Sequence, residues 1–156
     1  MITIDVPGYK VFKLKHLVLD YNGTIACDGQ LISGVKEKLE ILEESIQVHI
    51  ITADTFQTVS SFLQGISCQF QIISSNEQDI RKLEYIRHLG TEFTVCIGNG
   101  RNDSLMLKEA VLGIAVILKE GAAVETLLSA DVVCTDILSA FELLLNPLRL
   151  TATLRL

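Results

Sequence analysis

The chain has 156 residues, of which 49% are hydrophobic and 21% charged, and its formal net charge is −6. This length suits one domain with a substantial core, so we expect a single domain over residues 1–156. An acidic chain lacks the basic surface that nucleic acid and anionic membranes attract, so neither is expected as a partner. The first residues hold no continuous apolar stretch of the signal-peptide kind, and a cytoplasmic location is expected.

Short apolar segments alternate with helical patterns along the chain. The apolar segments are rich in Val and Ile and hydrophobic on both faces, as parallel strands covered by helices are. We expect strands at residues 16–20, 47–52, 70–73, 93–98, 112–117 and 131–134. Helical patterns fall at residues 33–45, 76–90, 101–110, 121–130 and 135–146. This alternation predicts an α/β fold, a doubly wound, Rossmann-like parallel sheet with helices on both faces.

Two segments carry more detailed expectations. Turn signals at Asn22-Gly23 and Asp28-Gly29 follow the first strand and predict a small β-hairpin beside its end. The helical pattern at 76–90 ends at Gly90, a common C-cap residue. Its apolar residues at helical spacing predict one buried stripe, formed by Ile80, Leu83, Ile86 and Leu89.

Polar residues follow the expected strands at their carboxyl ends, which is where an open parallel sheet binds its ligands. A helix lysine can reach the same edge of the sheet. The residues that we expect to meet there are Asp20, Asn22, Thr24, Thr52, Ala53, Asp54, Lys82 and the segment 97–103.

These side chains supply the parts that phosphoryl transfer requires. A carboxylate such as Asp20 can attack phosphorus and form an acyl-phosphate. Fixed donors and a cation neutralise the phosphoryl oxygens during that step. Mg²⁺ binds one or two carboxylates together with neutral oxygens and water, which Asp20, a backbone carbonyl near Asn22 and the 99–103 segment can provide.

Each of these features also has a plainer interpretation when it is taken alone. The residues after Asp20 can be an ordinary strand exit, Thr52 or Asp54 can cap a helix over 55–65, and Lys82 can be a solvated helix lysine. The functional interpretation is favoured because all of them occur in order, each at the correct end of its element.

The four segments resemble the motifs of the haloacid dehalogenase-like (HAD) hydrolase superfamily. The first motif, D-x-D-x-T or D-K-T-G-T, is similar to "DYNGT" at 20–24, and the second to "IITAD" at 50–54. The third is a lysine, here Lys82, and the fourth, G-D-G-x-N-D, is similar to "GNGRND" at 98–103. The resemblance covers nearly the whole chain and is closest to small soluble P-type ATPase-like members.

The resemblance implies a role for each matched residue. Asp20 would be the phosphorylated nucleophile and a Mg²⁺ ligand, and Asn22 would offer its backbone carbonyl to the metal. The phosphoryl group would be held by Thr52, Ala53 and Lys82. Asp103 would anchor the metal or its waters, with Asn99 beside it in the same motif.

Two departures from the superfamily pattern alter what the resemblance implies. Asn22 stands where phosphatases carry an aspartate that protonates the leaving group and then activates water, and an amide has no proton to exchange near neutral pH. General acid–base catalysis contributes about 10²–10⁴-fold, so slow turnover is expected. Asn99 stands where a metal-binding aspartate is usual, so Mg²⁺ is expected to bind weakly.

The segments between the motifs are too short to hold a cap domain. Either the mouth of the site is open to a large substrate, or a neighbouring subunit covers it. The leucine-rich tail after residue 140 favours a homo-oligomer, and packing of this tail on the chain's own sheet is equally compatible with its sequence.

The sequence therefore predicts a capless, Mg²⁺-dependent phosphohydrolase acting on a small phosphorylated substrate or a phosphoprotein. Two alternatives stay open. One is a degenerate HAD module that binds a phosphorylated ligand or partner without turnover, which the two asparagines favour. The other is a dehalogenase, because relatives with that activity also lack the second aspartate of the first motif and need no metal.

Overall fold

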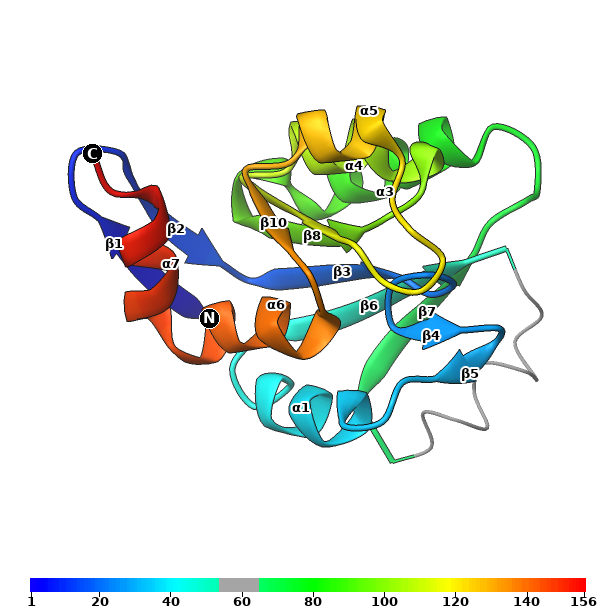
Figure 1. The fold of residues 1–156 in the computed structure, drawn as a ribbon, viewed down its shortest axis with the longest axis horizontal. Helices are drawn as coiled ribbons and strands as arrows, with labels where there is room; N and C mark the ends of the chain where they lie inside the picture. The colour runs from blue at the N-terminus through cyan, green and yellow to red at the C-terminus, as the bar shows by residue number, and fades with distance from the viewer. Residues whose placement is uncertain (54–64) are drawn as a thin grey trace.

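A six-stranded parallel sheet forms the centre of the computed structural model, which describes residues 1–53 and 65–156 (Figure 1). All five strand pairs are parallel, and β3 lies between β6 and β8. The strands, in spatial order, are β10 (Val132–Cys134), β9 (Leu112–Val116), β8 (Thr94–Gly98), β3 (His16–Asp20), β6 (Gln47–Thr52) and β7 (Cys68–Ile72). The helix expected over 55–65 and its possible cap Asp54 lie outside the described residues, apart from residue 65.

Helices cover both faces of this sheet, as expected for a doubly wound fold (Figure 1). One face carries α3 (Gln78–Leu89), α4 (Ser104–Glu109) and α5 (Val124–Ser129), and the other carries α1 (Val35–Leu42) and α6 (Ile137–Leu145). Two short 3₁₀ turns, Thr91–Phe93 and Arg101–Asp103, precede β8 and α4. The predicted α/β fold is confirmed, with strand limits that differ from the predicted ones by at most two residues.

The two faces of β3 show why its sequence is apolar throughout. Leu17 and Leu19 point into the core on the α1 and α6 side, while Val18 belongs to the cluster under α3 and α4. A central strand that is covered on both faces has no solvent-facing position until its end. The first polar side chain of the strand's buried part is therefore Asp20, at the carboxyl edge of the sheet.

The predicted hairpin is present as β4 (Ala26–Cys27) and β5 (Gln30–Leu31). Asp28 and Gly29 at its tip have φ angles of 51° and 75°, the positive values that a type I′ turn requires. Between Thr24 and Thr52 the chain forms only this hairpin, α1 and β6. The expectation that this stretch inserts no cap domain is confirmed.

An unpredicted unit lies beside the central sheet, where β1 (Ile2–Val6) and β2 (Lys10–Leu14) pair antiparallel and α7 (Pro147–Leu154) packs on β1 (Figure 1). Alternate residues of the two strands are buried, and this period of two is a signal that could have revealed them. In α7 Leu150 is buried and the hydroxyl of Thr151 donates to the carbonyl of Asp5 at 2.9 Å. The leucine-rich tail therefore packs on its own chain, with α6 on the central sheet and α7 on the N-terminal hairpin.

The buried stripe predicted for α3 needs a correction. Ile80 is 43% exposed, whereas Lys82 is 1% exposed, and Ile86 is the fully buried apolar residue of the helix. The helix is turned so that Lys82 faces the carboxyl edge of the sheet, where two carboxylates receive its charge.

Among the described residues, no single helix is long and apolar enough to cross a membrane. Only α6 and α7 taken together reach that length and composition, and they meet at a bend of 100°.

Candidate active site

Side chains from neighbouring strand ends meet in a pocket of about 280 Å³ at the carboxyl edge of the sheet. Asp20 ends β3, Thr52 ends β6, and Asn99 follows β8. Because β3 is paired with both β6 and β8, these three residues are brought together by strand order alone.

An ion-pair triad forms the base of this pocket. Nζ of Lys82 lies 2.6 Å from Oδ1 of Asp20 and 2.6 Å from Oδ1 of Asp103. All three side chains are almost fully shielded from solvent. A lysine is buried at a cost unless opposite charges surround it, and here two carboxylates supply that compensation.

The charges of the triad do not cancel, which affects Asp20 most. Burial, followed by the nearby charge of Asp103, raises the pKa of Asp20 to about 7, although Lys82 and Thr24 act in the opposite direction. Burial alone would lower the pKa of Lys82, but the charges of Asp20 and Asp103 outweigh it and raise that pKa. Lys82 is therefore a permanent cation, and ionisation of Asp20 beside Asp103 gives the triad one negative charge more than Lys82 balances.

Asp103 is held by the backbone of the loop that precedes it. Its Oδ2 accepts hydrogen bonds from the backbone N–H groups of Asn99, at 3.0 Å, and Gly100, at 2.9 Å. A Cβ atom at Gly98 would lie 2.5 Å from Cγ of Asp103, so only glycine allows the carboxylate to approach the strand end this closely. Both oxygens of Asp103 are thus engaged, by Lys82 and by the loop.

A threonine hydroxyl links the nucleophile candidate to the loop after β8. Oγ1 of Thr24 lies 3.2 Å from Oδ2 of Asp20 and 3.2 Å from Oδ1 of Asn99. Gly23 makes this approach possible, because its φ is +77° and a Cβ there would lie 2.4 Å from Nδ2 of Asn99. The "DYNGT" and "GNGRND" segments are therefore in direct contact.

The oxygens around Thr24 fit a magnesium ion. One hydroxyl proton cannot satisfy both Oδ2 of Asp20 and Oδ1 of Asn99, so accepting lone pairs remain there. The donor set is entirely oxygen, and the triad has an excess negative charge that a divalent cation would balance. Direct ligation by Asp20 and Asn99 suits this geometry better than direct ligation by Asp103, whose oxygens are already engaged.

The other predicted site residues also lie at this pocket. Asn22 and Ala53 are exposed at its wall, and Thr52 is buried beside Asp20. Of the other residues expected at the site, Thr24 contacts Asp20 and Asn99, and Asp103 lies behind Lys82. Asp54 is outside the described residues. The catalytic, phosphate-binding and metal-binding roles of the site residues stay predictions.

The sequence analysis assigned no role to several residues that line the pocket. Asn102 donates through Nδ2 to Oε1 of Gln78 at 2.6 Å, and both side chains face the pocket. Asn102 lies inside the "GNGRND" segment, so the motif itself pointed to it. Glu120 also lines the pocket and comes from the turn after β9, where no motif marked it.

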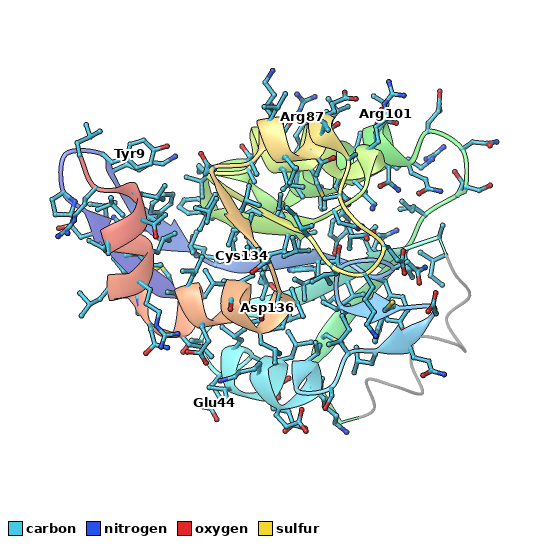
Figure 2. All side chains as sticks on the ribbon, in the orientation of Figure 1. Tyr9, Glu44, Arg87, Arg101, Cys134 and Asp136 are labelled. Atoms are coloured by element: carbon cyan, nitrogen blue, oxygen red, sulfur yellow. The ribbon has the colours of Figure 1, made fainter. Side chains whose placement is uncertain are left out.

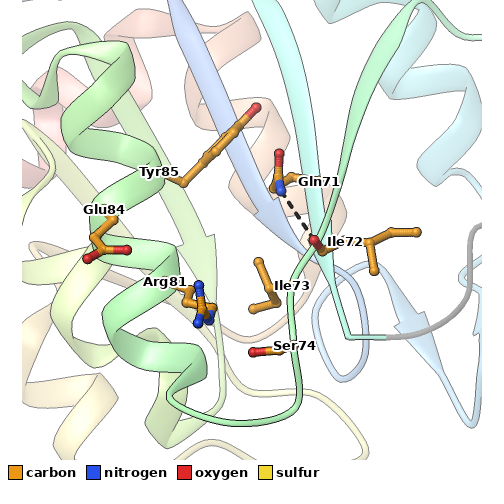
Figure 3. Close-up of a pocket in the computed structure, with 7 residues that line it drawn as sticks. All are labelled: Gln71, Ile72, Ile73, Ser74, Arg81, Glu84 and Tyr85. Atoms are coloured by element: carbon orange, nitrogen blue, oxygen red, sulfur yellow. Dashed lines mark hydrogen bonds between the residues drawn. The ribbon is translucent and has the colours of Figure 1, made fainter.

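Two arginines near the site in sequence do not reach it. Arg81 lines a separate pocket of about 500 Å³ between β7 and α3, together with Tyr85 and Ser74 (Figure 3). Arg101 extends from the outer surface beyond α4 (Figure 2) and pairs with Glu125 at 2.9 Å. Of the described residues that line the pocket at the carboxyl edge, Lys82 is the one cation.

Two proteins of Methanocaldococcus jannaschii are similar to this chain in sequence. The uncharacterized protein MJ0073 is 49% identical over 82 residues, which cover 50% of this chain and 88% of that protein. The uncharacterized protein MJ0072 is 54% identical over 39 residues, which cover 25% of this chain and 89% of that protein. No protein-family model matches the chain.

Solved structures of HAD phosphatases share the fold. A 3-deoxy-D-manno-octulosonate 8-phosphate phosphatase of Moraxella catarrhalis, in complex with magnesium, phosphate and sugar, superposes with a TM-score of 0.69 at 20% identity, covering 92% of this chain and 94% of that one. The cobalt-bound phosphatase of Haemophilus influenzae has a TM-score of 0.64 at 16% identity, covering 91% and 93%. A Legionella pneumophila protein assigned to HAD subfamily III A has a TM-score of 0.67 at 21% identity, covering 90% and 88%.

Proposed function

Because this chain belongs to the same family as protein MJ0073 of Methanocaldococcus jannaschii and has the fold of HAD superfamily hydrolases, we propose that it is a phosphohydrolase that forms an aspartyl-phosphate at Asp20. The observation that carries this proposal is the buried pair of Asp20 and Lys82, 2.6 Å apart at the base of the pocket. A carboxylate held this way beside a fixed cation is suited to attack a phosphorus atom whose oxygens the cation neutralises.

The chain's own residues account for orientation and charge in the first step. Lys82 and the hydroxyl of Thr24 contact different oxygens of Asp20 and so fix the plane of the carboxylate. An oxygen of Asp20 forms the new bond to phosphorus while the bond to the leaving oxygen breaks and its electron pair leaves with that oxygen. Lys82, with Thr52 and the backbone near Ala53, would bind the phosphoryl oxygens.

Magnesium fits the oxygens of Asp20 and Asn99, with the backbone carbonyl of Asn22 as a third candidate ligand. When bound, such an ion supplies positive charge to the phosphoryl oxygens and balances the excess negative charge of the triad. Because Asn99 contributes a dipole where an aspartate would contribute a charge, weak binding of the ion is part of the proposal.

The second step would be slow in this chain. Water must lose a proton as it attacks the phosphorus of the aspartyl-phosphate, and Asn22 has no basic group to accept that proton. Slow turnover of a phosphorylated small molecule or a phosphoprotein therefore follows from the side chain at residue 22. The asparagines at 22 and 99 also support a second candidate function, a module that binds a phosphorylated ligand without turnover.

Hydrolysis of a generic phosphomonoester such as p-nitrophenyl phosphate tests the proposal, with and without Mg²⁺. We expect slow, metal-dependent release of phosphate that disappears in Asp20→Asn while the circular dichroism spectrum is kept. Asp5→Asn, which changes an exposed aspartate on β1, is the matched control and should retain the activity. If Asp20→Asn hydrolyses the ester as fast as the wild-type protein does, the proposed nucleophile is wrong.

A further inference from the structure

A tight turn after β9 carries a carboxylate to the mouth of the pocket. The backbone N–H of Gly121 donates to the carbonyl of Leu118 at 2.9 Å and closes the turn, and Gly121 has a φ of +75°. Glu120, the third residue of this turn, lines the same pocket as Asp20. Its exposed position gives it access to whatever part of a substrate extends out of the pocket.

The side chain of Asn99 holds this turn in place. Its Nδ2 donates to the carbonyl of Gly121 at 3.0 Å, and its backbone carbonyl accepts from the N–H of Ala123 at 2.9 Å. Its Oδ1 faces the hydroxyl of Thr24, so only one orientation of the amide places the oxygen toward this hydroxyl and the nitrogen toward the carbonyl of Gly121. An ionised aspartate has no proton for the Gly121 carbonyl, which gives a physical reason for an amide at this position.

The hairpin holds Glu120 from the other side of the mouth. The backbone N–H of Asp28, at the tip of the β4–β5 hairpin, donates to Oε1 of Glu120 at 3.2 Å. The carboxylate is thus placed by the turn that carries it and by this contact from the hairpin. One of its oxygens is engaged by the hairpin, and the second can face a ligand.

The electrostatic character of the mouth follows from these positions. Lys82 is the one cation among the described residues lining the pocket, and its charge is already shared by Asp20 and Asp103. Glu120 adds a negative charge at the outer side, where the leaving group of a bound phosphate ester would lie. A positively charged leaving group would gain from this field, and a negatively charged one would be repelled.

We propose that Asn99 is a positioning residue that fixes the Leu118–Gly121 turn, and that Glu120 on this turn selects phosphate esters whose leaving group carries a positive charge, such as an ammonium group. This inference rests on the proposed function, because it assigns the substrate class of the same site. An exposed ion pair contributes about 0.2–1 kcal/mol in general, which corresponds to a preference of up to about fivefold.

The preference for a positively charged group can be measured without turnover by using two phosphonates, in which a C–P bond replaces the ester linkage. They are 2-aminoethylphosphonate and ethylphosphonate, which differ by the ammonium group, and their affinities are measured by calorimetry with Mg²⁺ present. We expect the wild-type protein to prefer the amino compound by about threefold to fivefold, and Glu120→Gln to bring the ratio of affinities to about one. Lys119→Gln, a charge change on the same turn, is the control and should not lower the ratio.

A double-mutant cycle tests the positioning role of Asn99. In Asn99→Ala the turn loses its anchor, so the ratio should fall toward one and Glu120→Gln should have no further effect on it. If Asn99 acts only on the metal, Asn99→Ala weakens both phosphonates equally and Glu120→Gln still lowers the ratio, which overturns the positioning role.

The remaining outcomes are also decisive. Equal binding of the two phosphonates by the wild-type protein, or a preference that survives Glu120→Gln, overturns the selection by Glu120 while the proposed hydrolysis can still stand. Binding of neither phosphonate overturns the phosphate site itself, and the inference with it. Selective binding without any hydrolysis of phosphate esters supports the inference and contradicts only the turnover.

Discussion

The ammonium group of Lys82 lies 2.6 Å from Oδ1 of Asp20, although 62 positions separate the two residues in the sequence. Asp103 takes the other contact of the same ammonium group at the same distance. A lysine that pairs with two buried carboxylates has both a structural and a proposed catalytic role. The same charge that stabilises the carboxylates would bind the oxygens of a phosphoryl group.

Replacement of this lysine should therefore impair binding and stability together. In Lys82→Ala the carboxylates of Asp20 and Asp103 lose their cation, and removing one partner of a buried pair costs about 3–5 kcal/mol in general. We expect a lower free energy of unfolding in urea and at least tenfold weaker binding of inorganic phosphate by calorimetry. Arg81→Ala, next to it on α3 but facing another pocket, is the control. Wild-type phosphate affinity in Lys82→Ala would show that another group binds the phosphoryl oxygens.

Asn99→Asp exchanges an amide donor for a charge at the edge of the metal site. Without metal, the carboxylate would face the carbonyl of Gly121 and leave it without its donor, so we expect a loss of about 1–3 kcal/mol in the free energy of unfolding. Mg²⁺ should bind the variant more tightly and raise its melting temperature more than that of the wild-type protein. A calorimetric titration that gives equal or weaker Mg²⁺ affinity in the variant would contradict ligation by residue 99.

A buried histidine should make stability depend on pH. Nδ1 of His49 lies 2.8 Å from the hydroxyl of Tyr85 and its Nε2 lies 3.0 Å from Nδ1 of His16. Burial, followed by the charge of His16, lowers the pKa of His49 to about 4. The unfolded chain takes up this proton below about pH 6.5 and the folded protein does not, so the contribution of His49 to stability is fully present above that pH and is lost between about 6.5 and 4. The raised pKa of Asp20 acts in the opposite direction over much of the same range, so the His49 contribution is isolated by comparison with a variant.

The expected size of this loss is about 3 kcal/mol for His49, since each pH unit between the two pKa values is worth about 1.4 kcal/mol. Urea unfolding at a series of pH values measures it. His49→Gln removes the titrating ring, so the difference in the free energy of unfolding between the wild-type protein and this variant should change by about 3 kcal/mol between about pH 6.5 and 4. His88→Gln, at an exposed position of α3, is the matched control. A difference between wild type and His49→Gln that stays constant over this range would contradict the prediction.

The predicted homo-oligomer now has a specific test. Leu148 of α7 is 83% exposed and Leu156 is 98% exposed, so the tail presents apolar surface even though Leu150 is buried against the N-terminal hairpin. Leu148→Lys should shift the protein toward monomer in sedimentation, because a charge would have to be buried in the contact. Ile41→Lys, at an exposed position of α1, is the control. A wild-type protein that stays monomeric at high concentration would reject the prediction.

The sequence predicted the sheet and the strand-end residues because both follow from local rules. A strand that is apolar on both faces is expected inside the sheet, and its last residue, Asp20, then lies where the carboxyl ends of the strands meet. The orientation of α3 did not follow, because its apolar spacing favours Ile80 as a core residue whereas the tertiary ion pairs bring Lys82 inward. Helix rotation is decided by contacts with distant residues, which periodicity does not contain.

The network around Asn99 was unpredictable for the same reason. Its contacts with Thr24 and Gly121 join three segments of the chain, and no spacing within any one of them indicates the others. Sequence alone favoured a metal ligand at residue 99, because the motif places a ligand there. The donor function of the amide became visible only when the carbonyl that receives it was located.

The exposed amide of Asn22 at the pocket wall gives the sharpest test of the proposed chemistry. An acyl-phosphate such as acetyl phosphate has a good leaving group, so phosphorylation of Asp20 hardly needs an acid. Hydrolysis of the aspartyl-phosphate does need a base, and Asn22 provides none. The wild-type protein should therefore accumulate a covalent phosphoryl-Asp20, seen as an increase in intact mass, that decays slowly.

Asn22→Asp adds a carboxylate two residues from the nucleophile and should shorten the lifetime of this intermediate. Turnover of esters with poor leaving groups should rise by a factor within about 10²–10⁴, the usual contribution of general acid–base catalysis. Saturating Mg²⁺ is required, because the new charge lies near Asp20 and would otherwise raise its pKa further. The double variant Asp20→Asn/Asn22→Asp has no nucleophile and should never gain mass. If the wild-type protein and Asn22→Asp both fail to label and the variant gains no activity, the site does not transfer phosphate, and a binding module is the better account of the fold.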